Sequence, residues 1–267
     1  VTLEPCSTYG RTPPCTEAII NAGISKVVYG ISDPNPKHAG RADKILRSTG
    51  IEVKSPVLEE ECRRINEAFF KWISSGIPFV TLKLASTLDA KISDSSGVSK
   101  WITSAETRRM VQLLRLRSDA ILIGANTLKV DRPSLTVRDL RKIRQPLRIV
   151  ASSKLDLKSA TKLFSSPKEG GEIRVVRART KSEWMRVFKK LGQDGVTSLL
   201  VEGGAGLASS LIDKGLIDKL EIHYAPLILG SGINAFTMKE RSLMSALKLK
   251  DAKIAKSGSD FIVSGYL

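Results

Sequence analysis

The sequence predicts an α/β protein made of two units. Short apolar strands alternate with helical segments along the chain, which is typical of a mixed or parallel sheet covered by helices. The length of 267 residues allows one large domain or two modest ones, and a hydrophobic fraction of 42% is enough for a packed core. The small, turn-forming residues of the segment 74–78 predict a linker, so we place the boundary between residues 1–75 and 76–267.

In the first unit we expect helices and short strands in alternation. Pro13 and Pro14 precede the first helix, and Gly50 ends the second. The predicted helices are 14–23, 42–48 and 57–74, and the predicted strands are 27–30 and 51–54. The first three residues, Val-Thr-Leu, are typical of a strand already in progress, so the chain is expected to be truncated at its N-terminus.

The second unit is predicted to contain more strands than helices. Four consecutive apolar residues at 120–123 indicate a strand buried on both faces. Thr103 or Ser104 caps a helix that carries Glu106 in its first turn. The predicted strands are 79–84, 120–123, 147–151, 173–176, 198–201, 220–227 and 261–266, and the predicted helices are 103–117, 182–191 and 206–214.

Composition excludes several protein classes. No apolar run approaches the ~18 residues that span a bilayer, so no integral membrane protein is predicted. Three cysteines do not form a disulfide framework. Cys62 occupies an apolar helical position and is interpreted as a core residue.

The charge is unusual and local. The net charge is +16, of which +15 lies in residues 81–190 and +11 in residues 141–190. It could mark a solvated surface, a phosphate-binding patch or a nucleic-acid face. Aromatic residues, at 5%, are too sparse for a stacking pattern, so no nucleic acid is expected as a partner. The basic stretch includes Arg141, Lys142, Arg144, Arg148, Lys154, Lys158 and Lys162.

Cys6 and Cys15 form a candidate metal site. Each follows a proline, and Cys15 lies where the first helix begins. A helix N-terminus lowers the pKa of a thiol, and thiolate sulfur is a good ligand for Zn²⁺. Burial of two cysteines as apolar filler is the alternative; the prolines and Gly10 in this short loop make it less favoured.

Residues 3–15, together with Asp33-Pro34-Asn35-Pro36, resemble the second zinc half-motif of the riboflavin-biosynthesis pyrimidine deaminases, a branch of the cytidine-deaminase superfamily. In that family an upstream His-x-Glu supplies the third zinc ligand and the proton shuttle. The chain contains no such motif. The resemblance therefore implies that Zn²⁺ binding and deamination belong to the full-length protein. Thr8 and Ala42 replace the family's usual His and Gly.

Residues 78–267 resemble the reductase half of the same bifunctional family, which has a dihydrofolate-reductase-like fold. The matching blocks are residues 81–92, 99–103, 114–121, 124–138, 201–204 and 225–230. The resemblance implies NADPH-dependent reduction of 5-amino-6-(5-phosphoribosylamino)uracil, with hydride delivered to C1′ of the opened ribose. It also implies a cytoplasmic homodimer.

The resemblance identifies Lys83, Asp131 and Glu202 as catalytic candidates. Lys83 lies between Leu82 and Leu84, so it needs a polar partner unless it points to solvent from an edge strand. It is the candidate for polarising or protonating the sugar oxygen. Asp131 could instead be a turn residue, and Glu202 could instead cap the helix that follows it.

The same resemblance assigns binding residues. Guanidinium groups suit phosphate oxygens, although Arg115 could also be an ordinary exposed helix arginine. The substrate set is Ser99, Arg115, Leu135 and Arg138, and the cofactor set is Ala85, Trp101, Thr127, Asp131, Ser153, Gly203, Gly204 and Gly206. Trp101 could be a core residue, and His223 is interpreted as structural. Ala90 replaces a usual glycine, which is unfavourable by ~1 kcal/mol if φ is positive there.

The glycines after the strand at 198–201 would let a helix N-terminus approach a pyrophosphate, although a tight turn explains them equally well. Three alternative functions remain open. One is a basic deaminase-superfamily protein that acts on or binds nucleic acid. The others are a non-catalytic paralogue and a different dihydrofolate-reductase-like enzyme.

Overall fold

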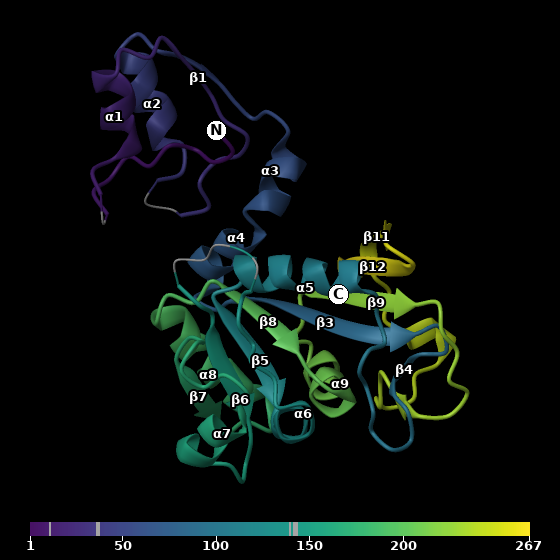
Figure 1. The fold of residues 1–267 in the computed structure, drawn as a ribbon. Coiled ribbons are helices and arrows are strands. Elements are labelled where there is room, and N and C mark those ends of the chain that lie inside the picture. The colour runs from purple at the N-terminus through teal and green to yellow at the C-terminus, as the bar shows by residue number, and fades with distance from the viewer. Residues whose placement is uncertain (11, 36–37, 139, 141–143) are drawn as a thin grey trace. The chain divides into compact units, whose positions relative to one another are not determined.

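A computed structural model describes residues 1–10, 12–35, 38–138, 140 and 144–267. Arg141 and Lys142 of the basic stretch lie outside the described residues, as does Pro36. The chain divides into two compact units, Val1–Ile77 and Pro78–Leu267, which are described in turn (Figure 1). None of the helices in the described ranges combines the length and apolarity that a membrane crossing requires.

The first unit pairs two short parallel strands with small helices. Its elements are α1 (Cys15–Asn21), β1 (Lys26–Val28), α2 (Arg41–Ser48), β2 (Glu52–Lys54), α3 (Glu59–Ile65) and α4 (Glu67–Ser75). The core contains Val27, Tyr29, Leu46 and Val53. The buried Glu4 carboxylate accepts hydrogen bonds from the backbone N–H groups of residues 33, 40 and 42, which tie the loop before α2 to the start of the chain.

Two details of the first unit differ from expectation. The single helix predicted over residues 57–74 is divided at Asn66 into α3 and α4. The Asn66 amide donates to the Cys62 carbonyl oxygen at 2.8 Å, a local side-chain bond that competes with regular helix. The expected N-terminal strand is reduced to one parallel bridge between Leu3 and Ile31.

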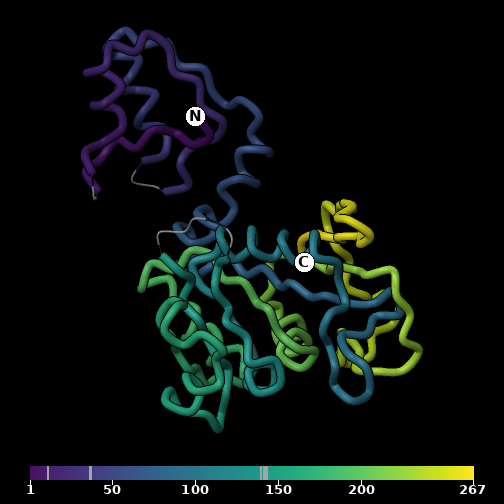
Figure 2. The backbone as a smooth tube through the Cα atoms, viewed as in Figure 1, coloured from purple at the N-terminus to yellow at the C-terminus, as the bar shows by residue number. Residues whose placement is uncertain are grey.

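The second unit is built on a mixed eight-stranded sheet in the order β11-β12-β9-β3-β8-β5-β6-β7 (Figure 1). Figure 2 traces the backbone of the chain in the same view. Neighbouring strands from β9 to β7 are parallel, and β12 and β11 complete one edge in antiparallel fashion. The strands are β3 (Phe79–Thr87), β5 (Ala120–Gly124), β6 (Leu147–Ala151), β7 (Ile173–Val176), β8 (Ser198–Glu202), β9 (Lys219–Ala225), β11 (Lys250–Ser257) and β12 (Asp260–Tyr266). The predicted mixed α/β sheet is confirmed.

Helices flank this sheet (Figure 1). They are α5 (Ala105–Arg117), α6 (Ala125–Asp131), α7 (Leu157–Leu163), α8 (Lys181–Gln193) and α9 (Ala205–Asp213). Ser104, one of the two caps expected for α5, accepts a hydrogen bond from the Thr107 N–H. A small sheet pairs β4 (Lys91–Ser93) with β10 (Ile233–Asn234), and a 3-10 turn, η1, spans Leu243–Ser245.

Arg148 is not part of a solvated basic surface. Its side chain is 0% exposed, on the central part of β6. The guanidinium donates to the carbonyl oxygens of Ser134, Ser166, Pro167 and Gly171 at 2.8–3.3 Å. Its carbon lies 4.8 Å from the centre of the Phe164 ring. One cation of the basic stretch, Arg148, therefore has a structural role, because its guanidinium joins the backbone of separate loops.

Candidate active site

A cleft of about 740 Å³ opens beside β3 and the C-terminal ends of β5 and β8. Ligands of open α/β sheets bind at this edge, where strands give way to loops and helices. The predicted site residues that line it are Lys83, Ala85, Ser99, Trp101, Arg115, Thr127, Asp131, Leu135, Arg138, Glu202, Gly203 and Gly204. The structure thus brings together residues that lie up to 121 positions apart in the chain.

Arg115 of α5 and Glu202 of β8 form a bidentate ion pair. Arg115 Nε lies 2.6 Å from Glu202 Oε1, and Nη2 lies 2.8 Å from Oε2. Their side chains are 11% and 13% exposed. Burial acts to raise the pKa of Glu202, but the charge and hydrogen bonds of Arg115 and the charge of Lys83 outweigh it, so this pKa is lowered. Glu202 therefore remains a carboxylate.

Lys83 lies between two carboxylates on the neighbouring strands. It is in register with Glu202 of β8 on one side and with Glu221 of β9 on the other. Residues in register on parallel strands place their side chains on the same face. Burial lowers the pKa of Lys83, which the Glu202 and Glu221 charges partly offset. Lys83 is therefore a partly buried lysine on a central strand that lines the cleft, and the edge-strand alternative is wrong.

Glu221 has a buried neighbour of its own. His223 Nε2 lies 2.7 Å from Glu221 Oε1, and the ring is 0% exposed. His223 is in register with Ala85, one of the cleft residues. Neither Glu221 nor His223 is among the residues that line the cleft, so the pair lies beside Lys83 on the neighbouring strand, outside the cleft lining.

Two of the predicted site residues, Ser99 and Asp131, are in contact at the C-terminal end of α6. Ser99 Oγ donates to Asp131 Oδ1 at 3.4 Å, and Lys100 Nζ donates to the Asp131 carbonyl oxygen at 3.1 Å. Asp131 is the last residue of α6, and the following turn includes Arg132 and Leu135, both with positive φ. The hydrogen bonds hold the loop around Ser99 against the end of α6.

Thr127 connects α6 to the glycine-rich turn. Its Oγ1 accepts a hydrogen bond from the Gly204 N–H at 3.1 Å. A Cβ on Gly204 would lie 3.3 Å from that oxygen, closer than most such contacts, so glycine suits this position. The turn at Gly203 and Gly204 then leads directly into α9.

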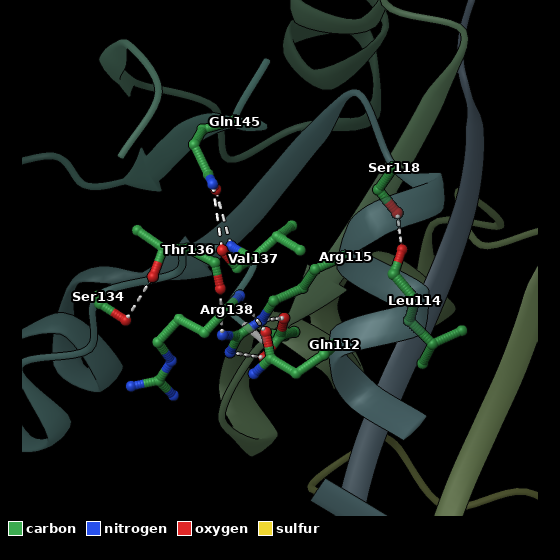
Figure 3. A network of polar contacts seen from close by, with 10 residues as sticks. Gln112, Leu114, Arg115, Ser118, Ser134, Thr136, Val137, Arg138 and Gln145 are labelled. Atoms are coloured by element: carbon green, nitrogen blue, oxygen red, sulfur yellow. Dashed lines mark hydrogen bonds and ion pairs between the residues drawn. The ribbon is translucent and has the colours of Figure 1, made fainter. Parts of the chain in front are cut away.

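Arg138 lines the cleft from a loop that is held in place by hydrogen bonds to Gln112 and Gln145. Its N–H donates to Gln112 Oε1 at 3.0 Å, and the adjacent Val137 backbone exchanges two hydrogen bonds with the Gln145 amide, at 2.7 and 3.1 Å. Arg115 Nη1 donates to the Thr136 carbonyl oxygen. The Arg138 guanidinium points away from Arg115 and remains exposed (Figure 3).

The sequence reasoning missed several cleft residues. Arg108 covers Trp101, with its guanidinium carbon 4.4 Å from the ring centre. Trp101 is 68% exposed, so the core alternative for it is wrong. Gln112 and Arg108 lie one and two turns before Arg115 on α5, and this spacing is the signal that could have identified them.

Ser153 and Gly206 line a second cavity, of about 510 Å³. It is bordered by the segments that follow β6 and β7 and by the first turns of α9. Gly206 lies in the first turn of α9, and no heavy atom lies within 4 Å of the position its Cβ would take. The predicted cofactor residues are therefore divided between two cavities, one lined by Gly203 and Gly204 just before α9 and the other by residues within α9.

In the first unit, Cys6 and Cys15 lie together. Their Sγ atoms are 3.4 Å apart, and the Cys15 N–H donates to Cys6 Sγ. The hydrogen bond to Cys6 and burial raise the pKa of the Cys15 thiol, contrary to the lowering expected from the helix N-terminus. Within the described ranges no third His, Cys, Asp or Glu joins them, and a catalytic zinc needs three protein ligands. These residues do not fit a complete zinc site.

Residues 78–263 match the model of the RibD C-terminal domain family, which covers most of the chain. The chain belongs to the RibD family. The riboflavin biosynthesis protein RibD of Aquifex aeolicus is 37% identical over 98% of this chain and 78% of its own length. The Escherichia coli protein of the same name is 37% identical over 86% of this chain and 71% of its own.

Solved structures of RibD proteins share the fold of both units. The deaminase/reductase of Thermotoga maritima has a TM-score of 0.87 and 36% identity over 99% of this chain and 78% of its own. Acinetobacter baumannii RibD has a TM-score of 0.81 and 30% identity over 99% of this chain and 79% of its own. The expected resemblance to the bifunctional family is confirmed.

Proposed function

We propose that this chain reduces 5-amino-6-(5-phosphoribosylamino)uracil with NADPH in riboflavin biosynthesis. One observation carries the proposal: Lys83, Asp131, Arg138 and the Arg115–Glu202 pair line a single cleft within the region that matches the RibD C-terminal domain. A relative of 36% identity is a deaminase and 5-amino-6-(5-phosphoribosylamino)uracil reductase by its name. The dihydrofolate-reductase-like assignment of this unit belongs to the same proposal.

The substrate phosphate fits best beside Arg138, whose exposed guanidinium enters the cleft. A guanidinium binds phosphate oxygens through two parallel N–H donors. Arg115 adds positive charge nearby but is held by Glu202 and Thr136. We therefore infer that Arg138 makes the principal phosphate contact, and that Arg115 keeps Glu202 ionised and in place.

Lys83 is positioned to polarise or protonate the ribose oxygen. Its ammonium group faces the cleft from a central strand and is flanked by Glu202. A lysine whose pKa is lowered by burial transfers a proton more readily near neutral pH than an exposed one. Ser99 and Asp131, which are hydrogen-bonded to each other, also line the cleft and would orient the opened sugar.

NADPH would supply a hydride to C1′ when bound. The residues present fit a dinucleotide: Gly203 and Gly204 leave the backbone open at the start of α9, and Thr127 fixes that turn. Ala85, Trp101 and Asp131 border the same cleft, and so does Leu135, which we assign to the substrate.

The first unit is proposed to be the C-terminal part of a cytidine-deaminase-like zinc domain, with Cys6 and Cys15 as two of its ligands. The two Sγ atoms already lie 3.4 Å apart beside the start of α1, which supports this assignment. We also propose that the protein forms a homodimer and is located in the cytoplasm.

The proposal is tested by measuring whether the purified chain reduces the substrate. NADPH oxidation is followed with 5-amino-6-(5-phosphoribosylamino)uracil as substrate, and Arg138→Gln is compared with Lys253→Gln, an exposed lysine of β11. The proposal predicts turnover in the wild type and control, and a raised KM in Arg138→Gln. Absence of turnover together with absence of NADPH binding in calorimetry would reject it.

The nucleic-acid alternative finds no support in the RibD relatives described above. It predicts RNA binding whose affinity falls steeply with salt concentration. We expect a Kd for RNA weaker than about 10⁻⁴ M at physiological salt, which is no stronger than ordinary non-specific binding.

A further inference from the structure

Glu221 is a second carboxylate beside Lys83, and the substrate contacts proposed above leave it without a role. It is in register with Lys83 on the side opposite Glu202, so the three side chains lie on one face of the sheet. The Glu221 side chain is only 15% exposed. A charge that is largely shielded from water acts on its neighbours more strongly than one in bulk solvent.

The charge of Glu202 is largely neutralised by Arg115. Both carboxylate oxygens of Glu202 accept hydrogen bonds from the Arg115 guanidinium, at 2.6 and 2.8 Å. Burial is the main cause that lowers the pKa of Lys83; the Glu202 charge opposes this effect, and the Arg115 charge adds to it. Because the two charges of the pair act in opposite directions, Glu221 is the carboxylate whose effect on Lys83 is left uncancelled.

The cleft adds further positive charge around Lys83. Neighbouring cations disfavour a protonated lysine, and a neighbouring carboxylate favours it. In the described part of the chain, Asp131 is the one lining carboxylate besides Glu202, and Ser99 Oγ donates to it at 3.4 Å. Apart from Lys83 and Arg115, the lining cations are Lys100, Arg108, Arg109, Arg132 and Arg138. Glu221 therefore offsets a surplus of cations from a position outside the lining.

His223 holds the Glu221 carboxylate in place. Its Nε2 lies 2.7 Å from Glu221 Oε1, and an ionised carboxylate can only accept, so Nε2 carries the proton. The other ring nitrogen, Nδ1, is buried and has no hydrogen-bond partner among the described residues. A proton on Nδ1 would be a buried donor without an acceptor, which is unfavourable. The contacts therefore favour a neutral ring that donates to Glu221.

The strand on the other side of this pair adds no competing charge. β12 places Ser264 in register with Glu221 and Ile262 in register with His223. Asp260, the charged residue of β12, accepts a hydrogen bond from the backbone N–H of Ser104 at the start of α5. Of the residues in register with Glu221 on the two adjoining strands, Lys83 is therefore the cation that can balance its charge.

We propose that Glu221, held by His223, is a positioning residue whose negative charge keeps the Lys83 ammonium protonated while the ammonium faces the cleft. It acts through its charge, across the spacing of two neighbouring strands, and leaves the ammonium to the substrate. The part of this inference that concerns catalysis rests on the proposed function. The charge link between Glu221 and Lys83 does not.

The first measurement follows Lys83 without substrate. The full chain is labelled with ¹³C at the ε-carbon of lysine, and the Lys83 signal in the NMR spectrum is identified by its loss in Lys83→Arg. A pH titration of this signal compares the wild type with Glu221→Gln, whose amide oxygen can still accept the His223 N–H. We expect the midpoint to fall by about one pH unit in Glu221→Gln and to stay near the wild-type value in Glu221→Asp, which keeps the charge.

Glu240→Gln is the matched control, because Glu240 is exposed and does not line the cleft. It should leave the Lys83 titration unchanged. His223→Leu should move the midpoint in the same direction as Glu221→Gln, because a carboxylate without its donor is no longer held beside Lys83. The two changes together should shift it no further than Glu221→Gln alone, as expected for residues that act as one unit.

The second measurement is the pH dependence of NADPH oxidation. The alkaline limb of kcat/KM should move to lower pH in Glu221→Gln by the same amount as the NMR midpoint, so that the rate on this limb falls about tenfold. A purely structural role for Glu221 would lower the melting temperature without moving either midpoint.

A folded Glu221→Gln variant whose Lys83 signal titrates as in the wild type would overturn the inference and leave the proposed reductase intact. An equal shift in Glu240→Gln would also overturn it. If Glu221→Gln does not fold, His223→Leu gives the same readout, and an unchanged Lys83 midpoint there would be equally decisive. A shifted Lys83 midpoint in a chain whose wild type has no turnover would instead overturn the proposed function, and the charge link would stand.

Discussion

Arg115 on α5 and Glu202 on β8 are joined by two hydrogen bonds of 2.6 and 2.8 Å in a largely buried setting. Their pairing connects the helix that covers the sheet to the strand that ends at the glycine-rich turn. Because Glu202 is also in register with Lys83, the pair contributes, together with Glu221, to the charge around the proposed catalytic lysine.

Removal of one partner should be more damaging than removal of both. Arg115→Met leaves a buried carboxylate unpaired and is expected to lower the free energy of unfolding by about 3–5 kcal/mol. The double variant Arg115→Met, Glu202→Met should recover part of that loss. Urea unfolding of both single variants and the double variant gives the coupling free energy, and additive losses would contradict a coupled pair.

The same pair predicts a dependence of stability on pH. The pKa of Glu202 is lower in the folded chain than its ordinary value of 4.5, so the native state binds fewer protons than the unfolded state. The ionised Glu202 carboxylate therefore contributes fully to the free energy of unfolding above pH 4.5. This contribution is lost as the pH falls through the lowered pKa of the folded chain. Glu202→Gln should flatten this acid limb of the unfolding free energy, and an unchanged limb would refute the assignment.

Lys83 should control the alkaline side of the reductase pH profile. Burial lowers its pKa from 10.5, and loss of the proton removes the proposed acid, so kcat/KM should fall at a pH below 10.5. Lys83→Met should reduce kcat by about 10²–10⁴-fold and leave NADPH affinity nearly unchanged. Lys253→Met is the surface control. An alkaline limb that persists in a residually active Lys83→Met variant would assign it to another group.

Arg148 should contribute to stability rather than to ligand binding. Arg148→Met leaves carbonyl oxygens of Ser134, Pro167 and Gly171 without their donors and is expected to cost about 3 kcal/mol or more. Lys158→Met, on the exposed face of α7, should change stability by less than about 0.5 kcal/mol. Chemical denaturation of both variants checks this. Equal stabilities would show that Arg148 is not a structural tie.

Ala90 has φ of +60°, in a turn closed by its N–H and the Thr87 carbonyl oxygen at 3.0 Å. The condition under which replacement of the usual glycine by Ala90 is unfavourable, a positive φ, is therefore met. Ala90→Gly should raise the free energy of unfolding by about 1 kcal/mol, because glycine adopts this conformation without strain. Ala252→Gly, in the exposed strand β11, should be neutral or destabilising. Thermal unfolding distinguishes the two outcomes, and a less stable Ala90→Gly would disprove the strain.

Sequence periodicity predicted the elements with a clear apolar face. Strands β6 and β7 are found at the predicted residues, and β3, β5 and β8 lie within a few residues of prediction. Strand β11 was missed because nearly all of its side chains are exposed and several are lysines, so it has no apolar alternation. Helices α6 and α7 were missed because each has only seven residues, too few to show a helical period.

The candidate site was predictable as a set of residues but not as a set of contacts. Arg115 and Glu202 could each be named from their motifs, yet their partnership joins positions 87 residues apart and depends on the sheet order. In the sequence, Arg148 is one cation among many in a basic stretch, which is typical of a solvated surface. In the structure it is buried, and four carbonyl groups accept its hydrogen bonds. Both sets of contacts depend on how segments far apart in the chain pack together, which the local sequence pattern does not predict.

Transfer of a labelled hydride tests the central claim most directly. The chain is incubated with NADPH carrying deuterium at the transferable C4 position and with 5-amino-6-(5-phosphoribosylamino)uracil, and the product is analysed by mass spectrometry and NMR. The account predicts one deuterium per ribitylamino product, located at C1′, and formation of this product about 10²–10⁴-fold more slowly by Lys83→Met. Product without deuterium at C1′, or no product from a chain that binds NADPH and substrate, would contradict it.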